Sequence, residues 1–199
     1  METKDIFITG GVASFLGKDI ISASSEKSSL PNTAEPMTSP TFGLCLGIQT
    51  MVIEFAREVL GYQDANSMEF APSAHPVIDM MEEQKSITQI GGTMRLGAYD
   101  CELKESCRAC EAYGGVRQIR ERHRHRYEFN NHYQDAFEVQ GMKCVGINPA
   151  AKLVEIVKIP TKRWYVGTQF HPEYSSTVLH PHPLFMSFIK ACIDGRTKA

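Results

Sequence analysis

Two short motifs contain the side chains that nucleophilic catalysis by a thiol requires. In GLCLG (43–47) a single cysteine lies between two glycines, directly before a stretch with helical spacing. A glycine turn at a helix start holds a sulfur exposed, and the helix amides favour a thiolate and a developing oxyanion. In QFHPE (169–173) a carboxylate follows a histidine by two residues, so it can orient the imidazole. Together the motifs predict Cys45 as nucleophile, His171 as base and Glu173 as the acceptor that orients the base.

Each motif by itself is also compatible with a structural role. A buried cysteine in a glycine turn, or a histidine at a strand end that is satisfied by its neighbours, would give the same local sequence. The combination of both motifs in one chain favours catalysis, because a thiol nucleophile needs a base and the base needs an orienting group.

The elements that would position these residues belong to an α/β fold that begins near residue 42. Apolar spacing predicts a helix over 48–60 that ends at Gly61, and a closing helix over 183–193. Expected strands are 75–80, 92–103, 125–130, 143–159 (a hairpin through Asn148-Pro149) and 164–170. A further strand is expected over 4–12 and the start of a helix over 14–24. No internal repeat is visible.

Composition sets few limits on function. The 199 residues are 42% hydrophobic and 22% charged with a net charge of −2, as in ordinary soluble domains, which gives no reason to expect nucleic acid or membrane as partner. No apolar run approaches the ~20 residues that span a bilayer, and the N-terminus does not have the pattern of a secretory signal, so we expect a cytoplasmic protein.

Two other patterns invite a different reading. Cys107 and Cys110 form a CxxC that, with His123 and His125, could bind zinc, but a surface loop with incidental cysteines is the favoured interpretation, and no metal site is expected. The run ERHRHR (121–126) could be a basic nucleic-acid patch. Strand alternation would instead put its arginines on one face and its histidines on the other.

The motifs stand in longer runs that resemble a known family. FGLCLGIQTMVIEFAREVLGYQDANSMEF with TQFHPEY resembles the class I (triad) glutamine amidotransferase domain. IGGTMRLGAYDCEL, ERHRHRYEFNN and QFHPEY…HPLF resemble the CTP synthases more narrowly, and the resemblance covers about residues 42–190. It implies an open sheet with flanking helices, here lacking its first strands.

The resemblance also implies roles for individual residues. Cys45 would attack the glutamine side-chain amide to form a thioester and release ammonia, with His171 transferring protons and Glu173 orienting it. Residues 91–97 resemble a mobile loop that shapes the glutamine site. The implied substrate-binding residues are Leu46 (through its amide, in the oxyanion hole), Gly47, Ile48, Gln49, Glu69 (at the glutamine amino group) and Arg126.

The N-terminal run ITGGVASFLGKDI (8–20) resembles the ATP-binding loop of the CTP synthase synthetase domain. Gly11, Gly17 and Lys18 would then contact ATP phosphates, although Asp19 departs from the family pattern. Residues 1–21 are thus interpreted as a remnant of the synthetase segment, 22–41 as a linker and 42–199 as an amidotransferase domain incomplete at its N-terminal side. A PGGFG-type loop of the oxyanion hole is not visible, and a strand from residues 4–9 could fold back into the gap.

The expected function is glutamine hydrolysis that supplies ammonia for ATP-dependent amination of UTP to CTP. No cofactor is expected on the amidotransferase part, whereas ATP and Mg belong to the full-length family. Expected partners are glutamine and either a full-length CTP synthase or further copies of the chain. The alternative is a truncated, catalytically impaired paralogue that regulates a full-length CTP synthase.

Overall fold

A mixed seven-stranded sheet forms the centre of the protein in a computed structural model that describes residues 8–10, 40–80, 94–105 and 107–194. The strand order is β1-β2-β10-β9-β8-β5-β6. Strands β1, β2 and β10 are parallel, and the remaining pairs are antiparallel. The strands are β1 Ile8–Gly10, β2 Thr41–Leu44, β5 Arg95–Leu103, β6 Gln118–His125, β8 Lys143–Ile147, β9 Val154–Lys158 and β10 Tyr165–Thr168.

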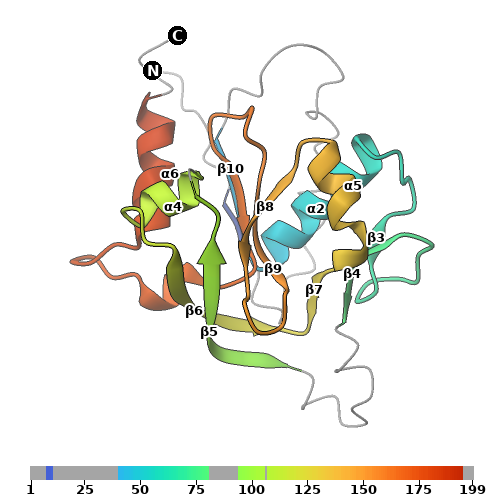
Figure 1. The fold of residues 1–199 in the computed structure, drawn as a ribbon, viewed down its shortest axis with the longest axis horizontal. Helices are drawn as coiled ribbons and strands as arrows, with labels where there is room; N and C mark the ends of the chain where they lie inside the picture. The colour runs from blue at the N-terminus through green and yellow to red at the C-terminus, as the bar shows by residue number, and fades with distance from the viewer. Residues whose placement is uncertain (1–7, 11–39, 81–93, 106, 195–199) are drawn as a thin grey trace.

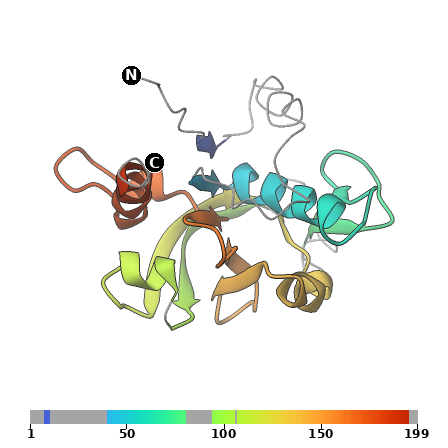
Figure 2. The same ribbon diagram turned by 90° about the horizontal axis from the view of Figure 1, so that it is seen from above.

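Helices cover both faces of this sheet (Figures 1 and 2). Helices α2 (Leu46–Glu58) and α5 (Gln134–Val139) pack on one face, around Ile48, Phe55 and Phe137. Helices α4 (Arg108–Ala112) and α6 (Pro183–Asp194) pack on the other. Because β2 and β10 are covered on both sides, nearly every residue in them is buried, as is usual for strands inside an α/β protein.

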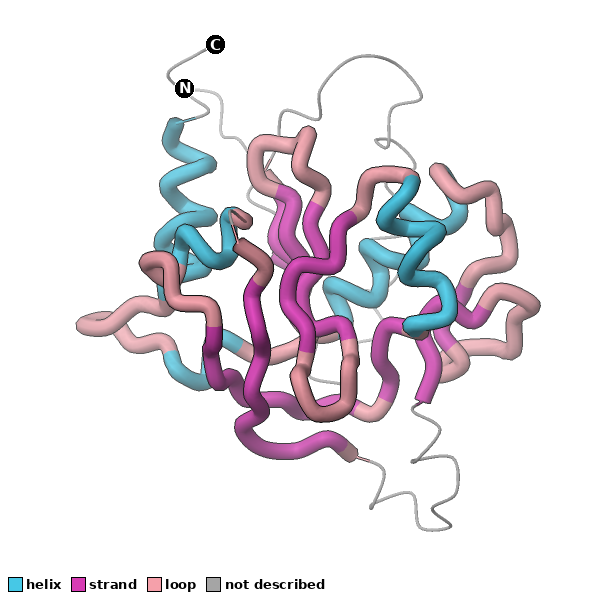
Figure 3. Tube along the Cα trace, in the orientation of Figure 1, coloured by secondary structure: helices cyan, strands magenta, loops and turns pink. Residues whose placement is uncertain are grey.

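A smaller sheet lies beside α2 (Figure 3). It has the order β3-β4-β7 and comprises β3 Asn66–Ser67, β4 Pro76–Met80 and β7 Tyr127–Phe129. Two 3-10 turns complete the described elements, η2 over Asn131–Tyr133 and η3 over Pro172–Ser175. Strand β7 follows β6 almost directly, so the chain passes from the edge of the large sheet into the small one.

Most predicted elements are confirmed. Helix α2 occupies the predicted region and ends before Gly61, which has a φ of 77°. Strands β8 and β9 pair antiparallel as the expected hairpin, and strand β1 from the N-terminal run pairs with β2. Short elements such as α4, α5 and β3 were not predicted, because a few residues do not establish a period. The helix expected over 14–24 and most of the expected linker lie outside the described residues.

The prediction of a surface loop around the CxxC is wrong. Cys107 caps the N-terminus of α4 and accepts a hydrogen bond from the Cys110 amide. Both thiols are buried in the hydrophobic core between α4, α6 and the sheet. The apolar character of a free cysteine explains the placement, since the side chain behaves as a small hydrophobe.

Candidate functional site

The two motifs predicted to be catalytic meet at one edge of the large sheet. Strands β2 and β10 are parallel neighbours in the register Leu44↔Thr168, so their carboxyl ends lie side by side. Cys45 follows β2 directly, and its amide donates to the Thr168 carbonyl at 2.7 Å. His171 comes soon after β10. Parallel pairing therefore brings together residues that are far apart in the sequence.

Cys45 occupies a strained turn between β2 and α2. Its φ is 49°, in the left-handed region that a residue with a side chain rarely adopts, and it is the N-cap residue of α2. Two glycines allow the helix to approach the strands closely. A Cβ on Gly43 would lie 2.7 Å from the backbone carbon of Gly47, and one on Gly167 would lie 2.9 Å from Ile48 Cγ1. The strain is of the kind that proteins retain at a nucleophile turn.

His171 and Glu173 form a close hydrogen-bonded pair. The His171 Nδ1 atom lies 2.6 Å from Glu173 Oε1, and the imidazole is almost fully buried. Burial disfavours the imidazolium, but the Cys45 sulfur and the Glu173 carboxylate outweigh it and raise the pKa of His171 to about 10. Burial would raise the pKa of Glu173, yet its bond to His171 lowers it.

The Cys45 thiol and the His171 imidazole lie close together without a hydrogen bond between them. His171 Nε2 is buried without a hydrogen-bond partner among the described residues. The Cys45 sulfur is nevertheless near enough to raise the pKa of His171. The two groups are therefore close but not hydrogen-bonded, and the charge of the sulfur acts on the imidazole through space. The Nε2 atom thus faces the sulfur side with its bonding capacity unused, which suits a group that transfers protons.

Two groups around the sulfur were not predicted from the sequence. The Gln169 side-chain amide lies 3.8 Å from Cys45 Sγ, and the Arg124 carbonyl oxygen lies 4.0 Å from it. Gln169 belongs to the QFHPE motif, so its place at the end of β10 is the signal that could have identified it. A backbone carbonyl carries no signal in the sequence.

The first turn of α2 supplies backbone amides beside Cys45. Leu46, Gly47 and Ile48 are the first residues of that helix, and the first amides of a helix have no partner within it. Gln49 is buried, and its Nε2 donates to the Tyr127 carbonyl at 2.9 Å, while its Oε1 has no hydrogen-bond partner among the residues that the structure describes. These groups can hold an anion or a polar substrate.

Glu69 and Arg126 lie within electrostatic reach of each other. Glu69 follows β3, and Arg126 joins β6 to β7. Partial burial raises the pKa of Glu69, while the Arg126 charge acts to lower it. Arg126 Nε is buried without a hydrogen-bond partner in the described part of the chain. The two residues predicted to bind opposite ends of an amino acid are therefore brought together by the fold.

A polar cluster supports the segment that carries Glu173. The Glu121 carboxylate accepts from the Tyr113 hydroxyl at 2.7 Å and from His182 Nε2 at 2.9 Å. Ser175, in η3, donates to the same carboxylate at 3.5 Å. The His182 Nδ1 atom accepts from the Leu184 amide at the start of α6. The cluster ties β6, α4 and α6 to η3 and so helps to fix the position of the Glu173 carboxylate that contacts His171.

The remaining predictions concern the ATP-binding run, the expected loop, a metal site and the run ERHRHR. Gly11, Gly17 and Lys18 lie outside the described residues, as do residues 91–93 of the expected loop. No group of three or more His, Cys, Asp or Glu side chains suited to a metal occurs in the described ranges. The histidines and arginines of ERHRHR do separate as predicted, because His123 and His125 are buried while Arg122 and Arg124 are exposed.

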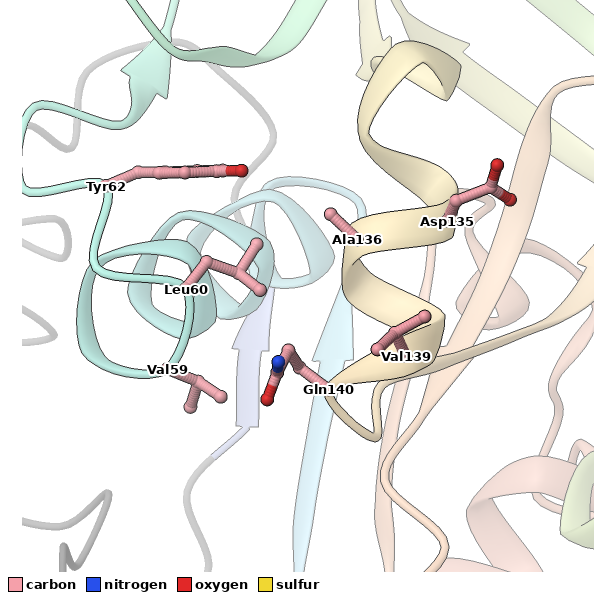
Figure 4. A pocket seen from close by; sticks show the side chains of 7 residues that line it. All are labelled: Val59, Leu60, Tyr62, Asp135, Ala136, Val139 and Gln140. Carbon is pink, nitrogen blue, oxygen red and sulfur yellow. The ribbon is translucent and has the colours of Figure 1, made fainter.

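A shallow groove lies between the ends of α2 and α5 (Figure 4). Cys45 lies at the opposite end of α2, which is about 20 Å long. The groove is lined by Val59, Leu60, Tyr62, Asp135, Ala136, Val139 and Gln140. It is therefore separate from the nucleophile turn.

No helix in the described part of the chain is long and apolar enough to cross a bilayer.

Known proteins resemble the chain in both sequence and structure. Over 156 residues it is 70% identical to the CTP synthase of Bacteroides fragilis, a match that covers 78% of this chain and 29% of the relative. The Porphyromonas gingivalis CTP synthase is 58% identical over 160 residues, which are 80% of this chain and 30% of the relative. The chain thus spans less than a third of the length of these relatives.

A solved structure has the same fold. It is described as "Trypanosoma brucei CTPS - glutaminase domain with bound acivicin", with a TM-score of 0.73 and 37% identity, covering 78% of this chain and 60% of that one. The family model for glutamine amidotransferase class-I matches residues 1–191. With Cys45, His171 and Glu173 gathered at one sheet edge of this fold, the chain belongs to the class I glutamine amidotransferase family.

Proposed function

We propose that the chain hydrolyses glutamine to glutamate and ammonia at Cys45. The observation that carries the proposal is the meeting of a strained cysteine turn with a His171–Glu173 pair at the carboxyl edge of β2 and β10. Family membership supports it.

The geometry supports a two-step acyl transfer. The Cys45 thiolate attacks the side-chain amide carbon of glutamine, and the oxyanion is held by the amide of Leu46. The C–N bond breaks, His171 gives its proton to the leaving nitrogen, and ammonia departs from a thioester. His171 then takes a proton from water, the resulting hydroxide attacks the thioester, and glutamate is released as the thiolate reforms. Glu173 keeps the imidazole oriented and favours its protonated form.

Substrate recognition is assigned to the groups that surround this turn. Glu69 binds the α-amino group of glutamine and Arg126 binds the α-carboxylate, because a guanidinium matches a carboxylate in charge and planar geometry. Gln49, with its unpartnered carbonyl oxygen, contacts the substrate beside the first turn of α2. Gly47 and Ile48 complete the turn and leave room for the amide to approach the sulfur.

We further propose that the ammonia serves a CTP synthase-type reaction, the ATP-dependent amination of UTP to CTP in the cytoplasm. The identity of up to 70% to CTP synthases supports this assignment. ATP and Mg would serve the amination and not glutamine hydrolysis. Gly11, Gly17 and Lys18 are the candidates for ATP contact. The ammonia acceptor would be held by a CTP synthase synthetase domain, in a full-length partner or in an assembly of copies.

The alternative of an impaired regulatory paralogue finds no support. The relatives are named CTP synthase, and the structural neighbour is described as a CTPS glutaminase domain.

The test is ammonia release from glutamine by the purified chain. We expect Cys45→Ala to abolish release, whereas Cys192→Ala, a half-buried cysteine on α6, should leave it unchanged. Acivicin, which is bound to the Trypanosoma brucei glutaminase domain, should inhibit the reaction. Release that persists in Cys45→Ala would refute the proposal.

A further inference from the structure

Five ionisable side chains form a closed ring in the core behind the nucleophile turn. Arg95 on β5, His123 and His125 on β6, Glu128 on β7 and Glu155 on β9 are all buried. Arg95 contacts both acids, with Nη1 3.2 Å from Glu128 Oε2 and Nη2 2.8 Å from Glu155 Oε1. The second of these is a charge contact that lacks the direction of a hydrogen bond.

The two histidines close the ring on its other side. His123 Nε2 lies 3.4 Å from Glu155 Oε2, and His125 Nδ1 lies 3.7 Å from Glu128 Oε1. Between them, His123 Nδ1 lies 2.8 Å from His125 Nε2, which is a hydrogen bond. Each side chain therefore touches two others, and the ring links four strands of the two sheets.

The charges of the ring determine how many protons it must hold. The contacts of the imidazoles with the carboxylates, at 3.4 and 3.7 Å, are close approaches and not hydrogen bonds. The ring nevertheless buries one guanidinium beside two carboxyl groups, so with both imidazoles neutral its charges balance when one carboxyl group holds a proton. The ring is then neutral, because one guanidinium faces one carboxylate, and neutrality minimises the cost of burial.

The electrostatics of the individual groups agree with this count. Burial raises the pKa of Glu128 to about 8 and that of Glu155 to about 7. Burial also lowers the pKa of His123 to about 2 and that of His125 to about 3, so both imidazoles are neutral near pH 7.

The ring adjoins the backbone that surrounds the nucleophile. Between its two histidines, β6 presents the Arg124 carbonyl 4.0 Å from Cys45 Sγ, and just before them the Arg122 carbonyl accepts the His171 amide at 2.8 Å. The Glu155 carbonyl accepts the Gln169 amide at 2.8 Å. Members of the ring thus sit on the segments that hold the sulfur and the base.

We propose that Arg95, His123, His125, Glu128 and Glu155 form a neutral ring that holds one proton and positions β6 and β9 against Cys45 and His171. They are positioning residues, since none of them is in contact with the sulfur. The proton can reside on either acid, because Arg95 contacts both carboxyl groups and the charges balance in both arrangements. The effect of the ring on catalysis rests on the proposed glutaminase activity, whereas the existence of the ring does not depend on that activity.

The groups that face the ring limit what else titrates with it. They are Tyr99 and Cys101 from β5, Glu121 from β6 and His171 after β10. Raising the pH through about 7 to 8 removes the ring proton and leaves one buried negative charge behind His171. The unfolded acids have a pKa of 4.5, so the stability that the bound proton contributes is full below that pH and is lost as the pH rises from there to about 8.

The test uses Glu→Gln substitutions, because a glutamine amide can replace a protonated acid. In Glu155→Gln the amide takes the place of the protonated acid, Glu128 carries the one negative charge, and the ring stays neutral. In Glu128→Gln, Glu155 carries the one negative charge, and the ring is again neutral. The double variant leaves the Arg95 charge without a carboxylate. We expect each single variant to retain kcat, whereas the double variant loses about 10–10²-fold in kcat with little change in KM for glutamine. Glu102→Gln, an exposed glutamate on β5, is the matched control.

An infrared measurement detects the proton without reference to activity. The unchanged chain should show the carbonyl band of a protonated, buried carboxylic acid at pH 6, which disappears above about pH 8. The band should be absent from both single variants and present in Glu102→Gln. Absence of the band from the unchanged chain would overturn the proposal, as would single variants as damaging as the double variant. If the band is found but no form releases ammonia, the ring stands and the proposed function fails.

Discussion

Replacing Gly43 by alanine tests whether the close approach of α2 to β2 sets the nucleophile geometry. The new Cβ would lie 2.4 Å from Met51 Sδ, 2.7 Å from the backbone carbon of Gly47 and 2.8 Å from its oxygen. The methionine can move, but the Gly47 backbone belongs to the first turn of α2. Ordinary contact begins at 3.4 Å, so the helix start must shift by about 0.7 Å relative to the strand.

Two consequences follow from that shift. Overpacking of this kind costs about 1–3 kcal/mol of unfolding free energy. The shift also displaces Cys45 and the amide of Leu46 from the substrate carbonyl, and a misplacement near 1 Å lowers a rate by roughly 10²-fold. We therefore expect Gly43→Ala to lose stability by about 1–3 kcal/mol and kcat for glutamine hydrolysis by roughly 10-fold to 10²-fold.

The assay combines urea unfolding with initial rates of ammonia release. The matched control is Gly61→Ala, at the far end of α2, where a Cβ meets nothing within 4 Å but φ is 77°. That variant should lose about 1 kcal/mol through backbone strain and keep its kcat. A Gly43→Ala protein with unchanged kcat would refute the reasoning, because it would show that the helix start does not need this spacing.

Three further predictions concern the charges of the site. Glu173→Gln removes the carboxylate that favours the imidazolium, so the pKa of His171 should fall in an NMR titration and kcat should drop by about 10²–10⁴-fold; an unchanged pKa would contradict the pairing. Because the pKa of His171 is raised to about 10, its contribution to stability is full below its unfolded pKa and is lost as the pH rises toward 10. Thermal unfolding from pH 6 to pH 10 should show that loss, and Cys45→Ala should reduce it, whereas an equal loss in that variant would exclude the thiolate as its cause. Arg126→Lys and Glu69→Gln should each weaken glutamine binding by about 1.5–3 kcal/mol, seen as a KM raised roughly 10- to 150-fold with kcat nearly kept; a fall confined to kcat would contradict the binding roles.

Local patterns were sufficient for most of the fold. The apolar spacing after Cys45 predicted α2, and the turn signal at Asn148-Pro149 predicted the β8–β9 hairpin. Alternation in ERHRHR predicted that its arginines and histidines lie on opposite faces of a strand. Each of these signals lies within a few residues. The short helix α4 was missed, and its cysteines were wrongly placed in a surface loop, because burial there depends on α6 and the sheet.

In the candidate site, too, some features could be predicted from the sequence and others could not. GLCLG and QFHPE identified Cys45, His171 and Glu173, and the last two are hydrogen-bonded as the motif predicts. Their catalytic roles, and those of Glu69 and Arg126, stay predictions until activity is measured. The contacts of the sulfur with Gln169 and with a backbone carbonyl could not be predicted, because they depend on the register of β2, β6 and β10.

The sequence by itself determined the family, and it predicted the cysteine turn and the histidine–glutamate pair, because contiguous residues carry these features and their spacing fixes the local geometry. Only the tertiary structure decided that the two motifs meet at one sheet edge, and that an arginine, two histidines and two glutamates from four strands close into a buried ring. The physical reason is that parallel pairing and burial act between segments distant in the chain, where no spacing rule connects the residues that come into contact.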